Sequence, residues 1–139
     1  MSATTCLLDT CAAMYLVANE PMANRALEAM DSAADHGIPL RISPITAWEV
    51  GMLQGKGRFR SSLTPQRWFE MLRTQPGITL CELTPEILLG SSFLPGTLHR
   101  DPADRIIAAT AREFGYTVIT RDRALLNYAA QGHLAVIEC

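Results

Sequence analysis

Short apolar runs alternate along the chain with longer segments whose apolar residues recur at helical spacing. The runs are typical of strands that are buried on both faces. We expect strands at residues 4–9, 38–43, 78–83, 116–120 and 134–139. We expect helices at residues 10–19, 21–37, 44–54, 65–74, 85–94 and 103–115, with a further short helix from residue 122. This alternation predicts an α/β sandwich with a mainly parallel sheet.

Local signals mark several of the predicted helix boundaries. Four helices begin with a capping residue that precedes a proline, at Ser43, Thr64, Thr84 and Asp101. Gly37 and Gly115 follow helical segments, where glycine commonly ends a helix. Asp104 lies three residues after Asp101, so "DPAD" resembles a capping box with Asp in place of Glu.

Composition narrows the class of protein. The 139 residues, 48% apolar and 19% charged, fit one globular domain spanning residues 1–139. The net charge of −2 gives no global attraction for nucleic acid or an anionic membrane, so contact with nucleic acid must be local or metal-mediated. The cysteines lack zinc-site spacing, and we expect Cys6 and Cys81 to be buried thiols. With no signal peptide or membrane-spanning run, we expect a cytoplasmic protein.

Four acids fall where strands end or helices begin. Asp9 ends the first predicted strand, and Asp122 follows the "TVIT" strand by two residues. Asp104 lies in the first turn of its helix, and Glu49 about a turn and a half into another. Ligands of open α/β sheets bind outside the carboxyl ends of the strands, so we expect these side chains to share one edge. Gathered carboxylates repel one another, and a hard cation such as Mg²⁺ or Mn²⁺ would neutralise them. The pattern predicts metal-dependent phosphate chemistry.

Each acid also has a purely structural interpretation. Asp101 and Asp104 suit the positive end of a helix dipole, and Asp122 suits an N-cap. Asp9 is compatible with an Asx turn, and Glu49 with an exposed helical position. The joint placement of the four acids supports the functional interpretation more strongly than any single acid does.

The motifs resemble the PIN domain family, and within it the VapC-type toxins of bacterial toxin–antitoxin pairs. The resemblance is carried by "LLDT" at 7–10, "SPITAWEV" at 43–50, "HRDPADRIIAATA" at 99–111 and "VITRDRALLNYA" at 118–129. It covers essentially the whole chain, with the motifs in the family's order. It implies a three-layer α/β/α sandwich and an endoribonuclease that depends on Mg²⁺ or Mn²⁺.

The resemblance assigns roles residue by residue. Asp9, Glu49, Asp104 and Asp122 match the four family acids, which implies that they are catalytic and bind the metal. Asp101 is expected to be a cap that supports the site. Some relatives carry a further acid where this chain has Asn127.

Basic residues are candidate contacts for RNA. The loop "GKGRFR" places Lys56, Arg58 and Arg60 around Phe59, which predicts phosphate contacts with possible base stacking, or else a solvated loop. The arginines that flank the acids are expected to contact substrate, to pair with the acids or to receive a partner's carboxylate; they are Arg105, Arg121 and Arg123. His99 is expected to be an exposed loop residue.

The resemblance also implies partners. These are an RNA substrate such as a tRNA or ribosomal RNA, a cognate VapB-like antitoxin, and a second copy of the chain. The early apolar residues Met14, Tyr15, Leu16 and Val17 are expected to lie in the core, with a subunit interface as the alternative.

Other functions stay open at this stage. A phosphatase with Asp9 as nucleophile would carry a second acid at position 11, where this chain has Cys11. A non-catalytic or regulatory PIN-like binding module and a nuclease for other structured nucleic acid are the remaining alternatives.

Overall fold

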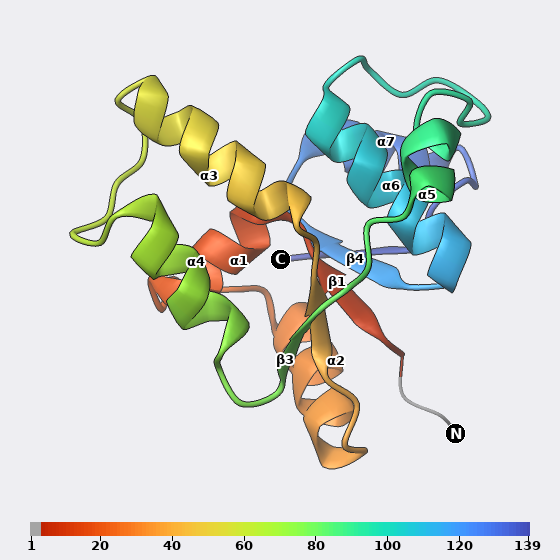
Figure 1. Cartoon of the computed structure of the whole chain (residues 1–139). Helices are drawn as coiled ribbons and strands as arrows, with labels where there is room; N and C mark the ends of the chain where they lie inside the picture. Colours follow the sequence, from red (N-terminus) through yellow and green to blue (C-terminus); the bar gives the residue numbers. More distant parts are fainter. Residues whose placement is uncertain (1–3) are drawn as a thin grey trace.

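A five-stranded parallel sheet forms the centre of the molecule (Figure 1). The computed structural model describes residues 4–139, so the first three residues of the predicted domain lie outside the described residues. The strands are β1 (Cys6–Leu8), β2 (Leu40–Ile42), β3 (Ile78–Leu80), β4 (Thr117–Thr120) and β5 (Val136–Glu138). Their order is β3-β2-β1-β4-β5, and every neighbouring pair is parallel. The predicted parallel α/β architecture is confirmed.

Helices connect the strands much as the apolar pattern predicts. They are α1 (Thr10–Val17), α2 (Asn24–Asp35), α3 (Ile45–Gly55), α4 (Pro65–Arg73), α5 (Pro85–Gly90), α6 (Pro102–Phe114) and α7 (Arg123–Ala130). Two boundaries differ from the prediction. The second helix begins at Asn24 and not at Pro21, and no side chain caps its N-terminus. The helix that begins at Pro85 ends at Gly90 instead of continuing to residue 94.

The predicted capping signals operate in most helices. Thr64, Thr84 and Asp101 each accept a hydrogen bond from the backbone N–H three residues later, as N-caps do. Ser43 instead accepts from the N–H of Ile45, two residues on. Gly115 ends α6 with φ +72°, a left-handed conformation that residues with a side chain rarely adopt.

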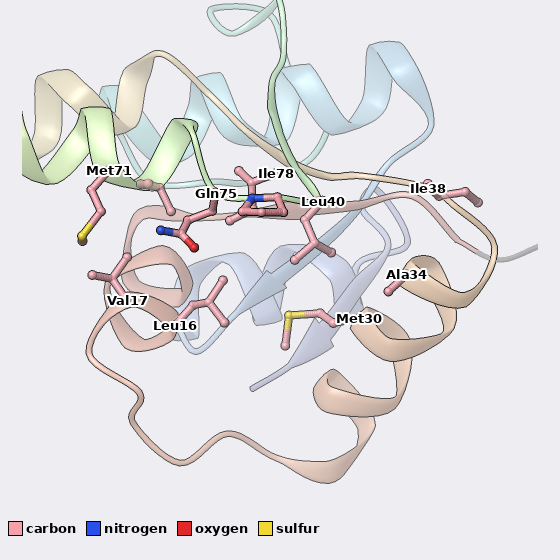
Figure 2. A pocket seen from close by; sticks show the side chains of 12 residues that line it. Leu16, Val17, Met30, Ala34, Ile38, Leu40, Met71, Gln75 and Ile78 are labelled. Carbon is pink, nitrogen blue, oxygen red and sulfur yellow. The ribbon is translucent and has the colours of Figure 1, made fainter.

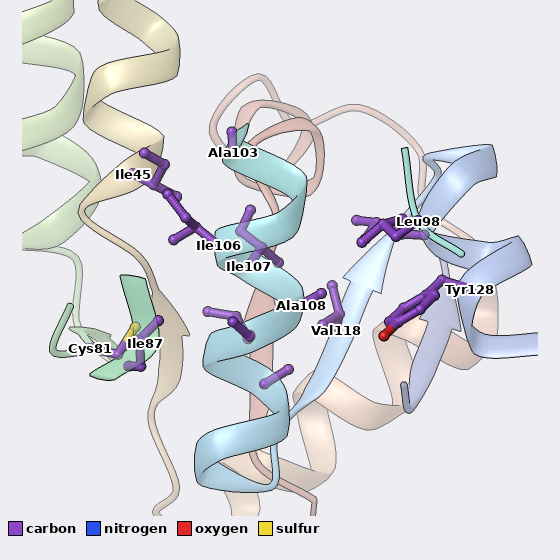
Figure 3. Close-up of a cluster of buried hydrophobic side chains, with 14 residues drawn as sticks. Ile45, Cys81, Ile87, Leu98, Ala103, Ile106, Ile107, Ala108, Val118 and Tyr128 are labelled. Atoms are coloured by element: carbon purple, nitrogen blue, oxygen red, sulfur yellow. The ribbon is translucent and has the colours of Figure 1, made fainter. Parts of the chain in front are cut away.

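Helices cover both faces of the sheet. Successive strand residues point to opposite faces, so Leu7 belongs to one buried cluster while Cys6 and Leu8 belong to the other. The first cluster packs α5, α6 and α7 against the sheet (Figure 3). The second packs α1, α2 and α4, and α3 contributes Ile45 to one cluster and Val50 to the other. These two helical layers around the sheet complete the predicted three-layer sandwich.

The early apolar residues and the thiols lie close to where they were expected. Met14, Leu16 and Val17 are half-buried and pack against the second cluster. Cys6 and Cys81 are buried free thiols, as predicted. Within the residues that the structure describes, no helix has the length and apolar character needed to cross a membrane.

The order of the strands defines one special position in the sheet. From β1 the chain continues outward through β2 and β3, and then returns to the other side of β1 to form β4 and β5. The switch point therefore lies between β1 and β4, where helices leave in opposite directions and open a crevice at the carboxyl ends of the strands. Asp9 directly follows β1, and Asp122 follows β4.

We expect the α6 layer to dominate stability. Ile107 is fully buried between α6 and the sheet, so Ile107→Ala leaves a cavity and should lower the free energy of unfolding by about 3 kcal/mol. Urea denaturation measures this change. Glu113→Ala, at an exposed position of the same helix, is the matched control and should change stability by less than about 0.5 kcal/mol. Equal effects of the two substitutions would contradict this packing.

Candidate metal centre

Asp9 is the most buried acid of the site. It caps α1, where its Oδ1 accepts a hydrogen bond of 2.7 Å from the N–H of Ala12. Its Oδ2 accepts a hydrogen bond from the hydroxyl of Thr120 at the end of β4. Only 3% of Asp9 is exposed, and both oxygens are engaged. This carboxylate is held rigidly and is poorly placed to act as the nucleophile of a phosphatase.

Thr120 connects Asp9 to Asp122. While its hydroxyl donates to Asp9, its oxygen accepts a bond of 2.9 Å from the N–H of Asp122. Asp122 in turn caps α7, accepting a bond of 3.0 Å from the N–H of Leu125. The structural and functional interpretations of Asp9 and Asp122 therefore coincide, because each caps a helix whose N-terminus lies at the switch point.

Glu49 reaches the same region from α3. Thr10, in the first turn of α1, donates its hydroxyl proton to Oε1 of Glu49. The Thr10 oxygen lies 3.1 Å from that of Thr46, and since Thr10 has a single proton, Thr46 must be the donor of this second bond. Thr10 thus orients Glu49 directly, and Thr46 holds the Thr10 hydroxyl in place.

Asp104 departs from the predicted capping box. Its backbone N–H donates to Oδ1 of Asp101 at 3.1 Å, as expected for a cap. Its carboxylate does not return the bond, because the N–H of Asp101 donates instead to Nδ1 of His99. Oδ2 of Asp104 lies 3.0 Å from Nε2 of His99. Because His99 satisfies the N–H of Asp101, the Asp104 carboxylate takes no part in capping and lies among the other acids.

Burial, and to a lesser extent mutual repulsion, raises the pKa of three of the acids. Burial and then repulsion by Asp122, Asp101, Glu49 and Asp9 raise the pKa of Asp104 to about 8. Burial raises the pKa of Asp9 to about 6, even though hydrogen bonds from Thr120 and Ala12 lower it. The pKa of Glu49 is also raised, chiefly by burial, against the lowering effect of the Thr10 hydrogen bond. A metal-free site therefore holds negative charge at a cost in free energy.

The donor atoms suit a hard divalent cation. Asp104, Asp122 and His99 each bring one ligand atom to within 4.8 Å of the others. Asp9 and Glu49 lie outside this group of three, yet both contribute to the raised pKa of Asp104. Carboxylate oxygens held at three helix N-termini and by threonine hydroxyls form a donor set that fits Mg²⁺ or Mn²⁺.

The basic side chains of the loop after α3 are exposed, whereas the aromatic residue between them is half-buried. Lys56, Arg58 and Arg60 are exposed in the loop after α3, but Phe59 is half-buried and packs edge-on against Trp68, with ring centres 5.8 Å apart. Its predicted base stacking is therefore not supported, because the ring is directed toward the core.

Two of the flanking arginines serve the fold. Arg105 donates to the carbonyls of Ser91 and Leu98, which fixes the segment before α6. Arg121 donates to the carbonyls of Cys139 and Pro21, and its guanidinium lies 4.1 Å from the ring centre of Tyr15. Neither guanidinium pairs with the acids, which was one of the three roles considered for the flanking arginines.

Four residues that position the acids were not predicted from the sequence; three contact an acid directly, and Thr46 acts through Thr10. His99 is exposed, as predicted, but its role beside Asp104 was not expected. The remaining three are the buried threonines at positions 10, 46 and 120. Each threonine is within three residues of a site acid, and that proximity is the one signal in the sequence that could have indicated them.

Comparisons with known proteins identify the family of the chain. A family model of the PIN domain matches residues 6–131. The chain belongs to the PIN domain family. A curated relative, Ribonuclease VapC22 of Mycobacterium tuberculosis, is 31% identical over 125 residues, which are 90% of this chain and 92% of that protein.

Solved structures of toxin–antitoxin proteins share this PIN fold. VapBC2 from Rickettsia felis, bound to a DNA fragment from its promoter, matches with a TM-score of 0.68 at 14% identity, over 96% of this chain and 98% of that one. A toxin–antitoxin complex from Klebsiella pneumoniae matches with a TM-score of 0.56 at 24% identity, over 98% and 96%. At these identities the likeness extends to the fold alone.

The raised pKa of Asp104 predicts how the metal-free protein responds to pH. Its folded pKa of about 8 exceeds the usual 3.8, so the stabilisation from its protonated form is complete below about pH 4 and is lost as the pH rises toward 8. Asp104→Asn removes this titration. It should raise the free energy of unfolding at pH 8, in EDTA, by on the order of 2 kcal/mol and change it little at about pH 4.

Urea denaturation of both proteins at the two pH values measures the effect. Glu113→Gln neutralises an exposed acid of the same helix and serves as the control. An Asp104→Asn effect of equal size at both pH values would contradict the electrostatic origin of the strain.

Proposed function

We propose that this PIN domain protein is a Mg²⁺- or Mn²⁺-dependent endoribonuclease and the toxin of a toxin–antitoxin pair. The observation that carries the proposal is the convergence of Asp9, Glu49, Asp104 and Asp122 at the switch point of the sheet, with three pKa values raised by burial and mutual repulsion. A relative named as a ribonuclease, similar over nearly the whole chain, supports the reaction class.

The four acids would hold the cation, with Asp101 as the cap that positions α6. When bound, the cation would supply Lewis acidity, lowering the pKa of a water and stabilising negative charge on the phosphate. The threonine hydroxyls hold Asp9 and Glu49 in place, so these carboxylates need not reorganise when the cation binds. Asp9, with its two engaged oxygens, is the most rigid of the proposed ligands.

RNA is the proposed substrate, with a tRNA or ribosomal RNA as the favoured class. Lys56, Arg58 and Arg60 would contact its phosphates, because all three are exposed in the loop that follows α3. Lys56 lies seven residues after Glu49, a rise of about 10 Å along a helix. A bound strand could therefore reach from the acids to the basic loop.

The second proposed partner is a VapB-like antitoxin. An apolar pocket of about 450 Å³ lies between α1, α2, α4 and the sheet (Figure 2). Leu16 and Val17 of α1, Met30 of α2 and Met71 of α4 are among the side chains that line it. The pocket would accept an apolar segment of the antitoxin, and α1 connects it directly to Asp9.

A homodimer is the proposed state of the free protein. Leu89 is 66% exposed in α5, and Phe93, just beyond that helix, is 81% exposed. The two residues are close in sequence, and large apolar side chains that gather on a surface commonly mark an interface. We propose that a second copy of the chain covers them.

Cleavage of RNA tests the proposed activity. The purified chain, freed of co-purifying protein, should cut total bacterial RNA into discrete fragments with Mg²⁺ or Mn²⁺ and not with EDTA. Asp9→Asn removes one charge with little change in volume and should lower the rate by at least about a hundredfold. Asp104→Asn should act alike, whereas Glu113→Gln should cleave at the wild-type rate.

Cleavage by Asp9→Asn at the wild-type rate would refute the metal assignment. If the wild type cleaved no RNA at all, a Mn²⁺ titration would separate two explanations. Binding would point to a nuclease whose specific RNA was missing from the sample, while no binding would favour a non-catalytic PIN-like module.

The dimer prediction concerns the surface around α5. The double variant Leu89→Ser, Phe93→Ser should sediment as a monomer at concentrations where the wild type, with its 15.2 kDa chain, is a dimer. Leu27→Ser, at a 41% exposed position of α2, is the control and should stay dimeric. A monomeric wild type would refute the dimer, and a dimeric double variant would refute this interface.

A further inference from the structure

Three hydrogen bonds join His99, Asp101 and Asp104 into a closed ring. The N–H of Asp101 donates to Nδ1 of His99 at 3.1 Å, and the N–H of Asp104 donates to Oδ1 of Asp101 at 3.1 Å. Nε2 of His99 lies 3.0 Å from Oδ2 of Asp104 and completes the ring. All three residues lie within the first turn of α6 and the loop that precedes it.

The ring fixes which nitrogen of His99 carries the proton. A backbone N–H can only donate, so Nδ1 must offer a lone pair to Asp101. The proton therefore resides on Nε2, which faces the Asp104 carboxylate. This contact is a hydrogen bond in which a neutral imidazole donates to the carboxylate, and Nε2 has no lone pair for a metal.

We propose that His99 is a positioning residue that orients Asp104 for the divalent cation through its Nε2–H. The inference rests on the proposed metal centre and assigns it a residue outside the four family acids. Nε2–H engages Oδ2 and leaves the remaining lone pairs of the carboxylate for the cation. Such outer hydrogen bonds commonly change metal affinity by about 10- to 100-fold.

A neutral donor suits this position better than a cationic one. Asp104 is repelled by Asp122, Asp101, Glu49 and Asp9, so it needs a donor that holds it in place before the cation arrives. A lysine or arginine here would hold Asp104 by its charge and would compete with the cation for the same carboxylate. Neutral His99 supplies the hydrogen bond without that competition.

Direct ligation by His99 is the alternative that the geometry disfavours. To bind a metal through Nε2, the ring would have to carry its proton on Nδ1. Two N–H groups, on Nδ1 and on Asp101, would then face each other across 3.1 Å. The bond from Asp101 would be lost, together with the closed ring.

Two substitutions separate the roles of the two ring nitrogens. In His99→Gln, the side-chain amide reaches about as far as Nε2 and can still donate to Asp104. In His99→Asn, the shorter side chain can accept from Asp101 as Nδ1 does, but it cannot reach Asp104. We expect His99→Asn and His99→Ala to weaken Mn²⁺ binding by about tenfold, and His99→Gln by less than about threefold.

Mn²⁺ binding is measured on the full chain by the electron paramagnetic resonance of the free ion. Pulsed measurements on the bound ion should detect no directly coordinated nitrogen in the wild type. Nitrogen coordination that His99→Ala abolished would overturn the positioning role in favour of direct ligation.

The other outcomes are equally decisive. Wild-type Mn²⁺ affinity in His99→Asn would overturn the inference. Weakened Mn²⁺ binding in His99→Gln, together with unchanged binding in His99→Asn, would also overturn it, because only the bond to Nδ1 would then matter. Each of these results would leave the metal centre itself intact. A wild-type protein that bound no Mn²⁺ would instead refute the proposed metal centre, and the role of His99 with it.

Discussion

Burial of neighbouring carboxylates at one edge of the sheet is the constraint on which the site depends. The parallel strands β1 and β4 end side by side, so Asp9 and Asp122 lie at the same switch point. Burial and mutual repulsion raise the pKa of Asp9, Glu49 and Asp104. The hydrogen bonds around the acids hold this charge in place without neutralising it.

The fold supplies those hydrogen bonds from elements that it needs in any case. Asp9 and Asp122 cap α1 and α7, so the N–H groups that every helix leaves unpaired become donors to the site. Thr120 belongs to β4 and Thr10 to the first turn of α1, and both donate hydroxyl protons to acids. Capping and site geometry are therefore one set of contacts, and a substitution that disturbs one disturbs the other.

The sequence predicted the parts of the site that follow from backbone topology. Asp9 and Asp122 could be placed because parallel strands align their carboxyl ends, and those strands were recognisable from their apolar runs. The hydroxyl of Thr120 could not be assigned, because its partner Asp9 lies 111 residues away in the chain. His99 was missed because a sequence shows a capping box but not which group satisfies the cap's own N–H. The start of α2 was misplaced by three residues because no side chain caps it.

Two arginines that flank the acids in the sequence do not neutralise them. Arg105 directly follows Asp104, and Arg121 directly precedes Asp122. Either arginine could have formed an ion pair within the site. Both guanidinium groups are instead bound to backbone carbonyls, and Arg121 also stacks on Tyr15. An ion pair with either arginine would have occupied a carboxylate of the site. With these two arginines engaged elsewhere, the acids would stay available to the proposed cation, and the raised pKa values of the metal-free protein would contribute to the driving force for binding it.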